Sequence, residues 1–163
     1  MPKQVVTRLK NLRWLWLSVV IIVFDQWSKR YAVKHLVLGQ PQRETSYLNF
    51  TLAHNAGASF SFLSHSGGWQ VWFFSLVAIA VCIGILWWLV KLPVARKLEC
   101  AALAFIFGGA VGNLFDRVRL GYVNDFIDFH WQQRHFAIFN IADSAVTIGV
   151  VLLLIAFVIR KKQ

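Results

Sequence analysis

Four long apolar segments alternate with more polar connections along this chain. The apolar segments cover about residues 12–36, 69–90, 98–115 and 141–159. Each falls within the roughly 17–25 residues that an α-helix needs to cross the hydrocarbon core of a bilayer. The pattern therefore predicts four membrane-spanning helices.

Two of the polar connections carry patterns typical of β-strands. Apolar and polar side chains alternate from Tyr47 to Ala53, and residues 123–130 are also compatible with a strand. Asn55 and Gly57, which follow the first of these stretches, mark a turn or a bulge. We therefore expect a small sheet beside the helices.

Composition agrees with a membrane protein of one domain. Hydrophobic residues make up 58% of the 163 positions, and the mean hydropathy is +0.56. Soluble domains are usually about 45–50% apolar. A chain of this length with few helices favours a single unit over residues 1–163 rather than two domains.

The net charge of +10 does not indicate a nucleic-acid-binding protein. The basic residues cluster at the ends of apolar segments, and the clusters at 3–13, 91–97 and 160–162 belong to the shorter connections and tails. Such clusters are typical of cytoplasmic segments, so both termini should be cytoplasmic. The first apolar run is not followed by a small-residue cleavage site, which favours a retained helix over a signal peptide.

Acidic residues gather in one region. Four of the seven, Asp116, Asp125, Asp128 and Asp143, lie between positions 108 and 143. A hairpin return would bring Asp125 and Asp143 together, and two carboxylates that share a proton can act as acid and base to activate water. We expect Asp143, at the start of a helix, to be ionised and Asp125 to hold the proton.

Each of these acids also has a structural alternative. Asp143 stands three residues after Asn140, which is the spacing of a helix capping box, and Asp125 fits a solvated loop. Asp116 and Arg117 suggest an ion pair at a helix end. Asp25 and Lys29, at positions i and i+4, suggest a local ion pair near the water interface or a functional role.

Other chemistries fit the chain less well. Ser144 has no histidine at a recognisable dyad spacing, and His130 and His135 have no cysteine nearby. No HExxH motif and no glycine-rich phosphate loop occur in the sequence. We therefore expect neither a metal site nor a cofactor. On a strand, Asp125 and Asp128 would face opposite ways, so at most one of them would point into a shared site.

Five short motifs together carry a resemblance to a known family. They are FDQWSK at 24–29, HNAGASFSF at 54–62, GGAVGNLFDR at 108–117, GYVNDF at 121–126 and FNIADS at 139–144. The sequence resembles the lipoprotein signal peptidases (signal peptidase II), which are membrane aspartic endopeptidases of bacteria. The motifs occur in family order and span nearly the whole chain.

The resemblance implies four membrane helices, an outward-facing β-cradle and catalysis by Asp125 and Asp143. The polar positions that surround this pair in the family correspond to Asn55, Asn113, Arg117 and Asn140. The supporting positions correspond to Asp25, Lys29, Gly57 and Asp116.

The implied reaction removes the signal peptide from a diacylglyceryl-modified prolipoprotein, just before the lipidated cysteine. The implied location is the bacterial inner membrane, and the implied partners are prolipoproteins, membrane lipids and globomycin-type inhibitors. Two alternatives remain from the residues alone: a small proton- or ion-coupled carrier, and a scaffold that pairs through the GxxxG motif of Gly108 and Gly112.

Overall fold

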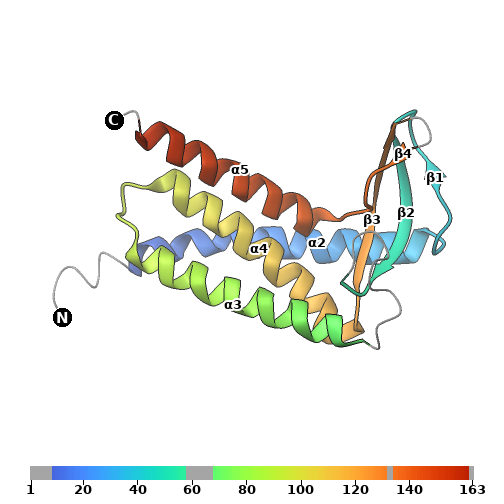
Figure 1. The fold of residues 1–163 in the computed structure, drawn as a ribbon, viewed down its shortest axis with the longest axis horizontal. Helices are drawn as coiled ribbons and strands as arrows, with labels where there is room; N and C mark the ends of the chain where they lie inside the picture. The colour runs from blue at the N-terminus through green and yellow to red at the C-terminus, as the bar shows by residue number, and fades with distance from the viewer. Residues whose placement is uncertain (1–8, 58–67, 132–133, 162–163) are drawn as a thin grey trace.

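The computed structural model describes residues 9–57, 68–131 and 134–161, which form four long helices and a small sheet (Figure 1). The helical elements are η1 (Lys10–Trp14), α2 (Leu15–His35), α3 (Trp69–Lys91), α4 (Lys97–Leu120) and α5 (Ile141–Lys161). The strands are β1 (Gln42–Arg43), β2 (Leu48–Asn55), β3 (Val123–Trp131) and β4 (Arg134–His135). The helices lie side by side, and the sheet stands at one end of the bundle, opposite the start of α2 and the end of α5.

Helix α4 is the centre of the bundle, because it packs against α2, α3 and α5. Small residues on α4 allow this close approach. A Cβ added at Gly108 would lie 3.0 Å from Ile21 of α2, and one added at Gly112 would lie 2.7 Å from Asp25 Oδ2, also on α2. Between them, a Cβ added at Gly109 would collide with the carbonyl oxygen of Ala142 in α5. The GxxxG motif therefore serves packing within the chain, rather than the pairing of chains that the scaffold alternative requires.

Three of the described helices, α3, α4 and α5, are long and apolar enough to cross a membrane. Their outer faces carry large exposed apolar side chains, among them Trp72, Leu76, Leu154 and Phe157. Such faces are expected to contact lipid rather than water. The fourth long helix, α2, is interrupted by charged residues and does not reach the same apolar content.

The helix boundaries agree with the sequence-based prediction except at the end of α4. We expected this helix to end near residue 115, but it continues to Leu120. Gly121 ends it in the left-handed conformation, with φ of +79° and a hydrogen bond from its N–H to the Arg117 carbonyl. The extra turn brings Asp116 and Arg117 onto the helix, and a glycine just beyond the last helical residue is a common stop signal.

The four strands form a sheet in the order β1-β2-β3-β4, with antiparallel neighbours. Both predicted strands are confirmed as β2 and β3. Asn49 pairs with Asp128 and Ala53 pairs with Asp125, and the register shifts between these two pairs. A shift of this kind inserts an extra residue on one strand and bends it. The extra residue is on β2. The start of β3, next to Asp125, is tied to α4 by a hydrogen bond from the Asn124 N–H to Asp116 Oδ2 at 3.3 Å.

Candidate active site

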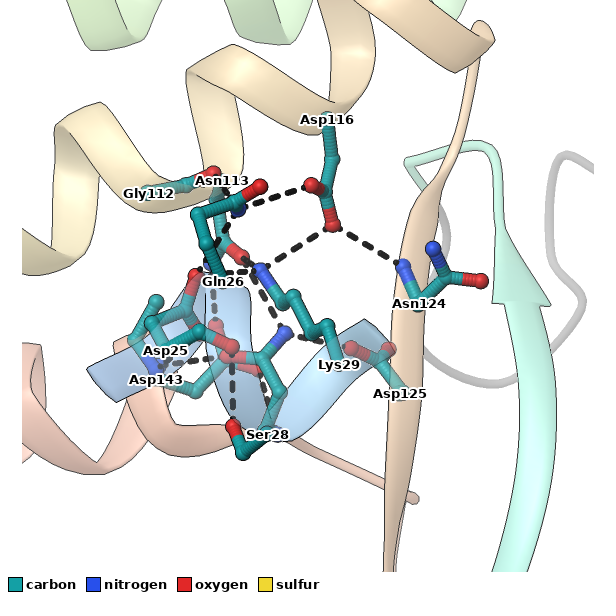
Figure 2. A network of polar contacts seen from close by, with 12 residues as sticks. Asp25, Gln26, Ser28, Lys29, Gly112, Asn113, Asp116, Asn124, Asp125 and Asp143 are labelled. Carbon is teal, nitrogen blue, oxygen red and sulfur yellow. Dashed lines mark hydrogen bonds and ion pairs between the residues drawn. The ribbon is translucent and has the colours of Figure 1, made fainter. Parts of the chain in front are cut away.

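Asp125 and Asp143 come from different elements and share one hydrogen-bonded network (Figure 2). Asp125 lies on β3 and Asp143 lies in the first turn of α5. Asn140, which immediately precedes α5, connects them. Its side-chain Nδ2 donates to Asp125 Oδ1 at 2.6 Å, and its backbone N–H donates to Asp143 Oδ2 at 3.2 Å. The two carboxylates are therefore held by the same residue.

Asn140 and Asp143 form the capping box that the sequence suggested. Asn140 Oδ1 accepts a hydrogen bond from the backbone N–H of Asp143 at 3.0 Å, in exchange for the bond that Asn140 N donates to Asp143 Oδ2. This exchange satisfies backbone donors at the helix start and fixes the Asp143 side chain. Asp143 therefore caps α5 and also belongs to the carboxylate network, so the structural alternative does not exclude the functional one.

Asp125 is buried, with 2% of its surface exposed. Asn55 Nδ2 donates to Asp125 Oδ2 at 2.9 Å, so both carboxylate oxygens accept a side-chain hydrogen bond. Burial raises the pKa of Asp125 to about 6, and the nearby Asp143 charge adds to the rise, while the bonds from Asn55 and Asn140 oppose it. The alternative of a solvated loop aspartate is wrong.

The turn after β2 holds Asn55 in place. Asn55 Oδ1 accepts a hydrogen bond from the backbone N–H of Gly57 at 2.9 Å, which leaves its Nδ2 to bind Asp125. Gly57 has φ of +123°, a backbone conformation that other residues rarely adopt. A Cβ at this position would also lie 2.5 Å from the Phe74 ring. The turn thus depends on glycine both for its backbone and for its space.

Asn113 on α4 links Asp143 to a buried lysine. Asn113 Nδ2 donates to Asp143 Oδ1 at 2.7 Å, while its Oδ1 accepts from Lys29 Nζ at 2.8 Å and from Asn140 Nδ2 at 3.1 Å. An ammonium group can only donate, so Lys29 forces Asn113 to present its oxygen to α2. The amide nitrogen must then face Asp143. Lys29 in this way sets the direction of a hydrogen bond to a carboxylate that it does not itself touch.

Lys29 is also the centre of a buried ion cluster that joins three helices (Figure 2). Its Nζ lies 2.9 Å from Asp25 Oδ2 and 3.1 Å from Asp116 Oδ2, and only 2% of the Lys29 side chain is exposed. Asp25 Oδ1 in turn accepts the backbone N–H of Ala142, at the start of α5, at 2.9 Å. The ion pair suggested between Asp25 and Lys29 is therefore confirmed, but it is buried and not purely local, because both residues also bind partners on other helices.

The prediction of an ion pair between Asp116 and Arg117 is wrong, because the Asp116 carboxylate pairs with Lys29 instead. Neighbours on a helix point in different directions, and Arg117 lies over the Phe74 ring, with Cζ 5.6 Å from the ring centroid. Arg117 is close enough to Asp125 and Asp143 for their charges to act on it. The guanidinium of Arg117 is therefore within electrostatic range of both carboxylates and of Asp116.

Asp128 lies on the same strand as Asp125 and is also buried. It accepts hydrogen bonds from Thr51 Oγ1 at 2.9 Å and from Asn49 Nδ2 at 3.4 Å, both on β2. These bonds tie β2 to β3 within the sheet. Sequence reasoning did not assign either partner a role.

Sequence reasoning also missed Gln26. Its Nε2 donates to Asp116 Oδ1 at 2.9 Å and to the Gly112 carbonyl at 3.2 Å, so it joins α2 to α4. The residue lies inside the FDQWSK motif, three positions before Lys29. That spacing places Gln26 and Lys29 on one side of the helix and was the available signal.

Comparisons with known proteins agree on one family. The model of the family described as signal peptidase (SPase) II matches residues 17–159. The chain is 51% identical over 153 residues to the lipoprotein signal peptidase of Acinetobacter baumannii, covering 94% of this chain and 87% of that protein. It is 48% identical to the lipoprotein signal peptidase of Alteromonas mediterranea, covering 89% of this chain and 80% of that protein.

A solved structure also matches. It is described as a bacterial membrane enzyme, and it superposes with a TM-score of 0.78 at 33% identity. The match covers 90% of this chain and 87% of the solved one.

Proposed function

We propose that Asp125 and Asp143 are the catalytic pair of this chain, which belongs to the signal peptidase II family of aspartic peptidases. It is a membrane protein that cleaves the signal peptides of lipoproteins. The observation that carries this assignment is the position of Asn140, which binds both carboxylates in a network shared with Asn113 and Lys29. An arrangement that holds two carboxylates together is what a peptidase needs to activate water.

The two aspartates take different roles in the free enzyme. Asp143 lies at the start of α5, where backbone N–H groups and the helix dipole favour a negative charge. Asp125 is buried, with its pKa raised to about 6. Two neighbouring carboxylates resist double ionisation, so the shared proton resides mainly on Asp125.

The reaction follows from this distribution of charge. Asp143 removes a proton from the attacking water, and the water oxygen bonds to the scissile carbonyl carbon. At the same time, Asp125 gives its proton to the carbonyl oxygen. In the second step, Asp125 takes a proton back from the tetrahedral intermediate, and Asp143 passes its proton to the leaving amine nitrogen. The C–N bond breaks, and both aspartates return to their starting protonation states.

The polar neighbours hold this pair in place. Asn55 and Asn140 orient Asp125, while Asn113 orients Asp143 under the influence of Lys29. Arg117, with its fixed positive charge beside the pair, is suited to bind the substrate backbone or to stabilise the charge that develops on the carbonyl oxygen. Asp25, Lys29, Gly57 and Asp116 act as supporting residues.

We also propose that residues 1–163 form one peptidase domain with four spans, both termini in the cytoplasm and the site facing outward from the bacterial inner membrane. The basic clusters at 3–13, 91–97 and 160–162 support this orientation. Helix α2 serves as the fourth span, since the charges of Asp25 and Lys29 are paired inside the bundle.

The proposed substrate is a prolipoprotein that already carries diacylglycerol on the cysteine after the cleavage site. The carboxylate pair lies at the ends of apolar helices, where acyl chains can stay in the membrane while the peptide reaches the site. Each buried CH₂ contributes about 0.8 kcal/mol to such binding. Globomycin-type inhibitors should compete with this substrate for the same site.

A cleavage assay tests the proposal. Purified enzyme should release the signal peptide from the diacylglyceryl precursor much faster than from the same precursor without lipid. The unlipidated precursor keeps every peptide contact and is therefore the matched control. Equal rates on the two precursors would contradict lipid recognition, and no cleavage of either would contradict the peptidase assignment for this chain.

The carrier alternative is less well supported. A carrier should place its ionisable groups along a path through the membrane. In the described part of the chain, Asp25, Asp116, Asp125 and Asp143 are joined in one network at the sheet end of the bundle.

A further inference from the structure

A cavity lies beside the carboxylate network, between the ends of α2 and α4 and the start of β3. It has a volume of about 410 Å³. Three exposed cations line it: Arg30 and Lys34 from α2 and Arg119 from α4. Lys29 and Asp116 also line the cavity, and Lys29 pairs with both Asp116 and Asp25. The three exposed cations outnumber the one negative charge that this cluster leaves over.

These three cations have no ion-pair partner among the described acidic side chains. Within the described ranges, the ion pairs involve Lys29 and Arg96 but none of these three residues. Arg30 and Lys34 stand at positions i and i+4, where like charges destabilise a helix. Arg119 adds a third positive charge from a different helix. An arrangement of this kind is relieved when an anion binds between the side chains.

Neighbouring aromatic residues indicate the depth of the cavity in the membrane. Trp27 and Tyr31 on α2, on either side of Arg30 in sequence, are 59% and 57% exposed and pack ring against ring. Exposed tryptophan and tyrosine side chains are enriched at the boundary between hydrocarbon and lipid headgroups. The cavity should therefore lie at headgroup level, where lipid phosphates are abundant.

The walls of the cavity match a lipid better than a free anion. Val33, Phe115 and Leu120 line it beside the cations, and all three are substantially exposed. A headgroup that binds the cations would leave its acyl chains against this apolar surface. Basic pockets between membrane helices are known to bind anionic lipid headgroups in this way.

We propose that the cavity lined by Arg30, Lys34 and Arg119 binds the phosphodiester headgroup of an anionic membrane lipid. The guanidinium groups of Arg30 and Arg119 suit two oxygens of one phosphate, and Lys34 adds a point charge. The proposed substrate lipid is a neutral diacylglyceryl group, so it offers no partner for these cations. The bound lipid is thus distinct from the substrate.

Lipid titration of the purified full-length protein tests this proposal. The protein is stripped of lipid, and phosphatidylglycerol binding is then followed by native mass spectrometry. The test variant combines Arg30→Gln, Lys34→Gln and Arg119→Gln. Because each such cation contributes about fivefold near an anionic lipid, we expect the triple variant to bind the tightest phosphatidylglycerol on the order of a hundredfold more weakly.

A matched variant controls for overall charge. Lys91→Gln, Lys97→Gln and Arg160→Gln remove three exposed cations from the other end of the bundle, and this variant should keep the tight site. Melting temperatures measured without lipid should be similar for all three proteins, because the altered side chains are exposed. Single variants of Arg30, Lys34 and Arg119, each expected to weaken binding about fivefold, provide the same test if the triple variant does not fold.

Two further lipids and inorganic phosphate identify the source of the anion. Phosphatidylcholine with the same acyl chains and diacylglycerol should both bind weakly, and inorganic phosphate should not displace phosphatidylglycerol at equal concentration. Equal binding of phosphatidylcholine would overturn the requirement for an anionic lipid. Displacement by phosphate at that concentration would show that the ligand is a free anion. An equal loss of phosphatidylglycerol binding in the control variant would show that the overall charge of the protein, and not this cavity, determines binding.

Discussion

Asn140 and Asp125 are joined by a hydrogen bond of 2.6 Å from the asparagine Nδ2 to the aspartate Oδ1. The same asparagine caps α5 through its exchange of hydrogen bonds with Asp143. The position of α5 and the position of the sheet are therefore linked through one buried side chain. Any movement of α5 along its axis would change the geometry of the carboxylate pair.

We expect Asp125→Asn and Asp143→Asn each to lower the cleavage rate to background. Loss of a positioned acid or base alone costs about 10²- to 10⁴-fold. Asp128→Asn should retain substantial activity per folded molecule, because Asp128 bonds to Thr51 and Asn49 on β2. Single-turnover cleavage, normalised to folded protein, measures all three. An inactive Asp128→Asn beside an active Asp125→Asn would refute the assignment.

The protonated carboxyl group of the free enzyme should titrate with a midpoint near pH 6, since the pKa of Asp125 is raised to about 6. The corresponding infrared band should fade as pH rises through this value and should be absent in Asp125→Asn. In Asp143→Asn the midpoint should drop, because the Asp143 charge is lost, but should stay above 3.8, because burial is the larger cause. A band lost only in Asp143→Asn would reverse the two roles.

The same shift makes folding stability depend on pH. Because the pKa of Asp125 is raised in the folded state, that state binds more protons than the unfolded chain between pH 3.8 and about 6. The contribution of Asp125 to stability is fully present below pH 3.8 and is lost as pH rises through about 6. This loss lowers the free energy of unfolding by roughly 3 kcal/mol. Denaturant unfolding should show this fall in the wild type and a flatter profile in Asp125→Asn.

Gly109→Ala should destabilise the bundle and reduce activity. The added methyl group would collide with the Ala142 carbonyl oxygen, a backbone atom next to Asp143. Overpacking of this kind costs about 1–3 kcal/mol. Gly84→Ala in α3 is the matched control, because no atom lies within 4 Å of its added Cβ. Thermal unfolding should show a lower midpoint only for Gly109→Ala, and equal midpoints would contradict the close packing of α4 on α5.

Cysteine labelling tests the orientation. In a chain whose native Cys82 and Cys100 are replaced by alanine, a cysteine at exposed Gln42 should react with an impermeant thiol reagent in intact cells. A cysteine at exposed Ala95, in the turn between α3 and α4, should react only after the membrane is opened. The opposite pattern would place both termini outside and the site in the cytoplasm.

The helices, the two main strands and the capping box could be predicted because each depends on nearby residues. Apolar runs define α3 and α5, alternation defines β2, and the spacing of Asn140 and Asp143 defines the cap. A hairpin return suggested that Asp125 and Asp143 could meet, and the resemblance to a known family singled them out as the catalytic pair.

The partners of Lys29 on α4 could not be predicted from local pattern, unlike Asp25, which lies one turn before it on α2. Its bond to Asn113 spans 84 positions, and Asp116 was assigned to Arg117 because the two are adjacent in sequence. The supporting hydrogen bond from Asn55 to Asp125 spans 70 positions. Contacts of this range depend on how the helices pack, which the order of apolar and polar residues does not specify.

The ion cluster around Lys29 also constrains how the protein is made. Helix α2 leaves the ribosome before the rest of the bundle, and until α4 and α5 follow, its Asp25 and Lys29 can pair only with each other. Charged residues in a lone span are costly to insert. Their partners on α4 and α5 follow 84 to 117 positions later. We therefore expect a nascent chain that ends at residue 95 to hold α2 only loosely in the bilayer, with an introduced cysteine at Ile21 open to aqueous reagent. Secure insertion of the first helix then awaits synthesis of the last.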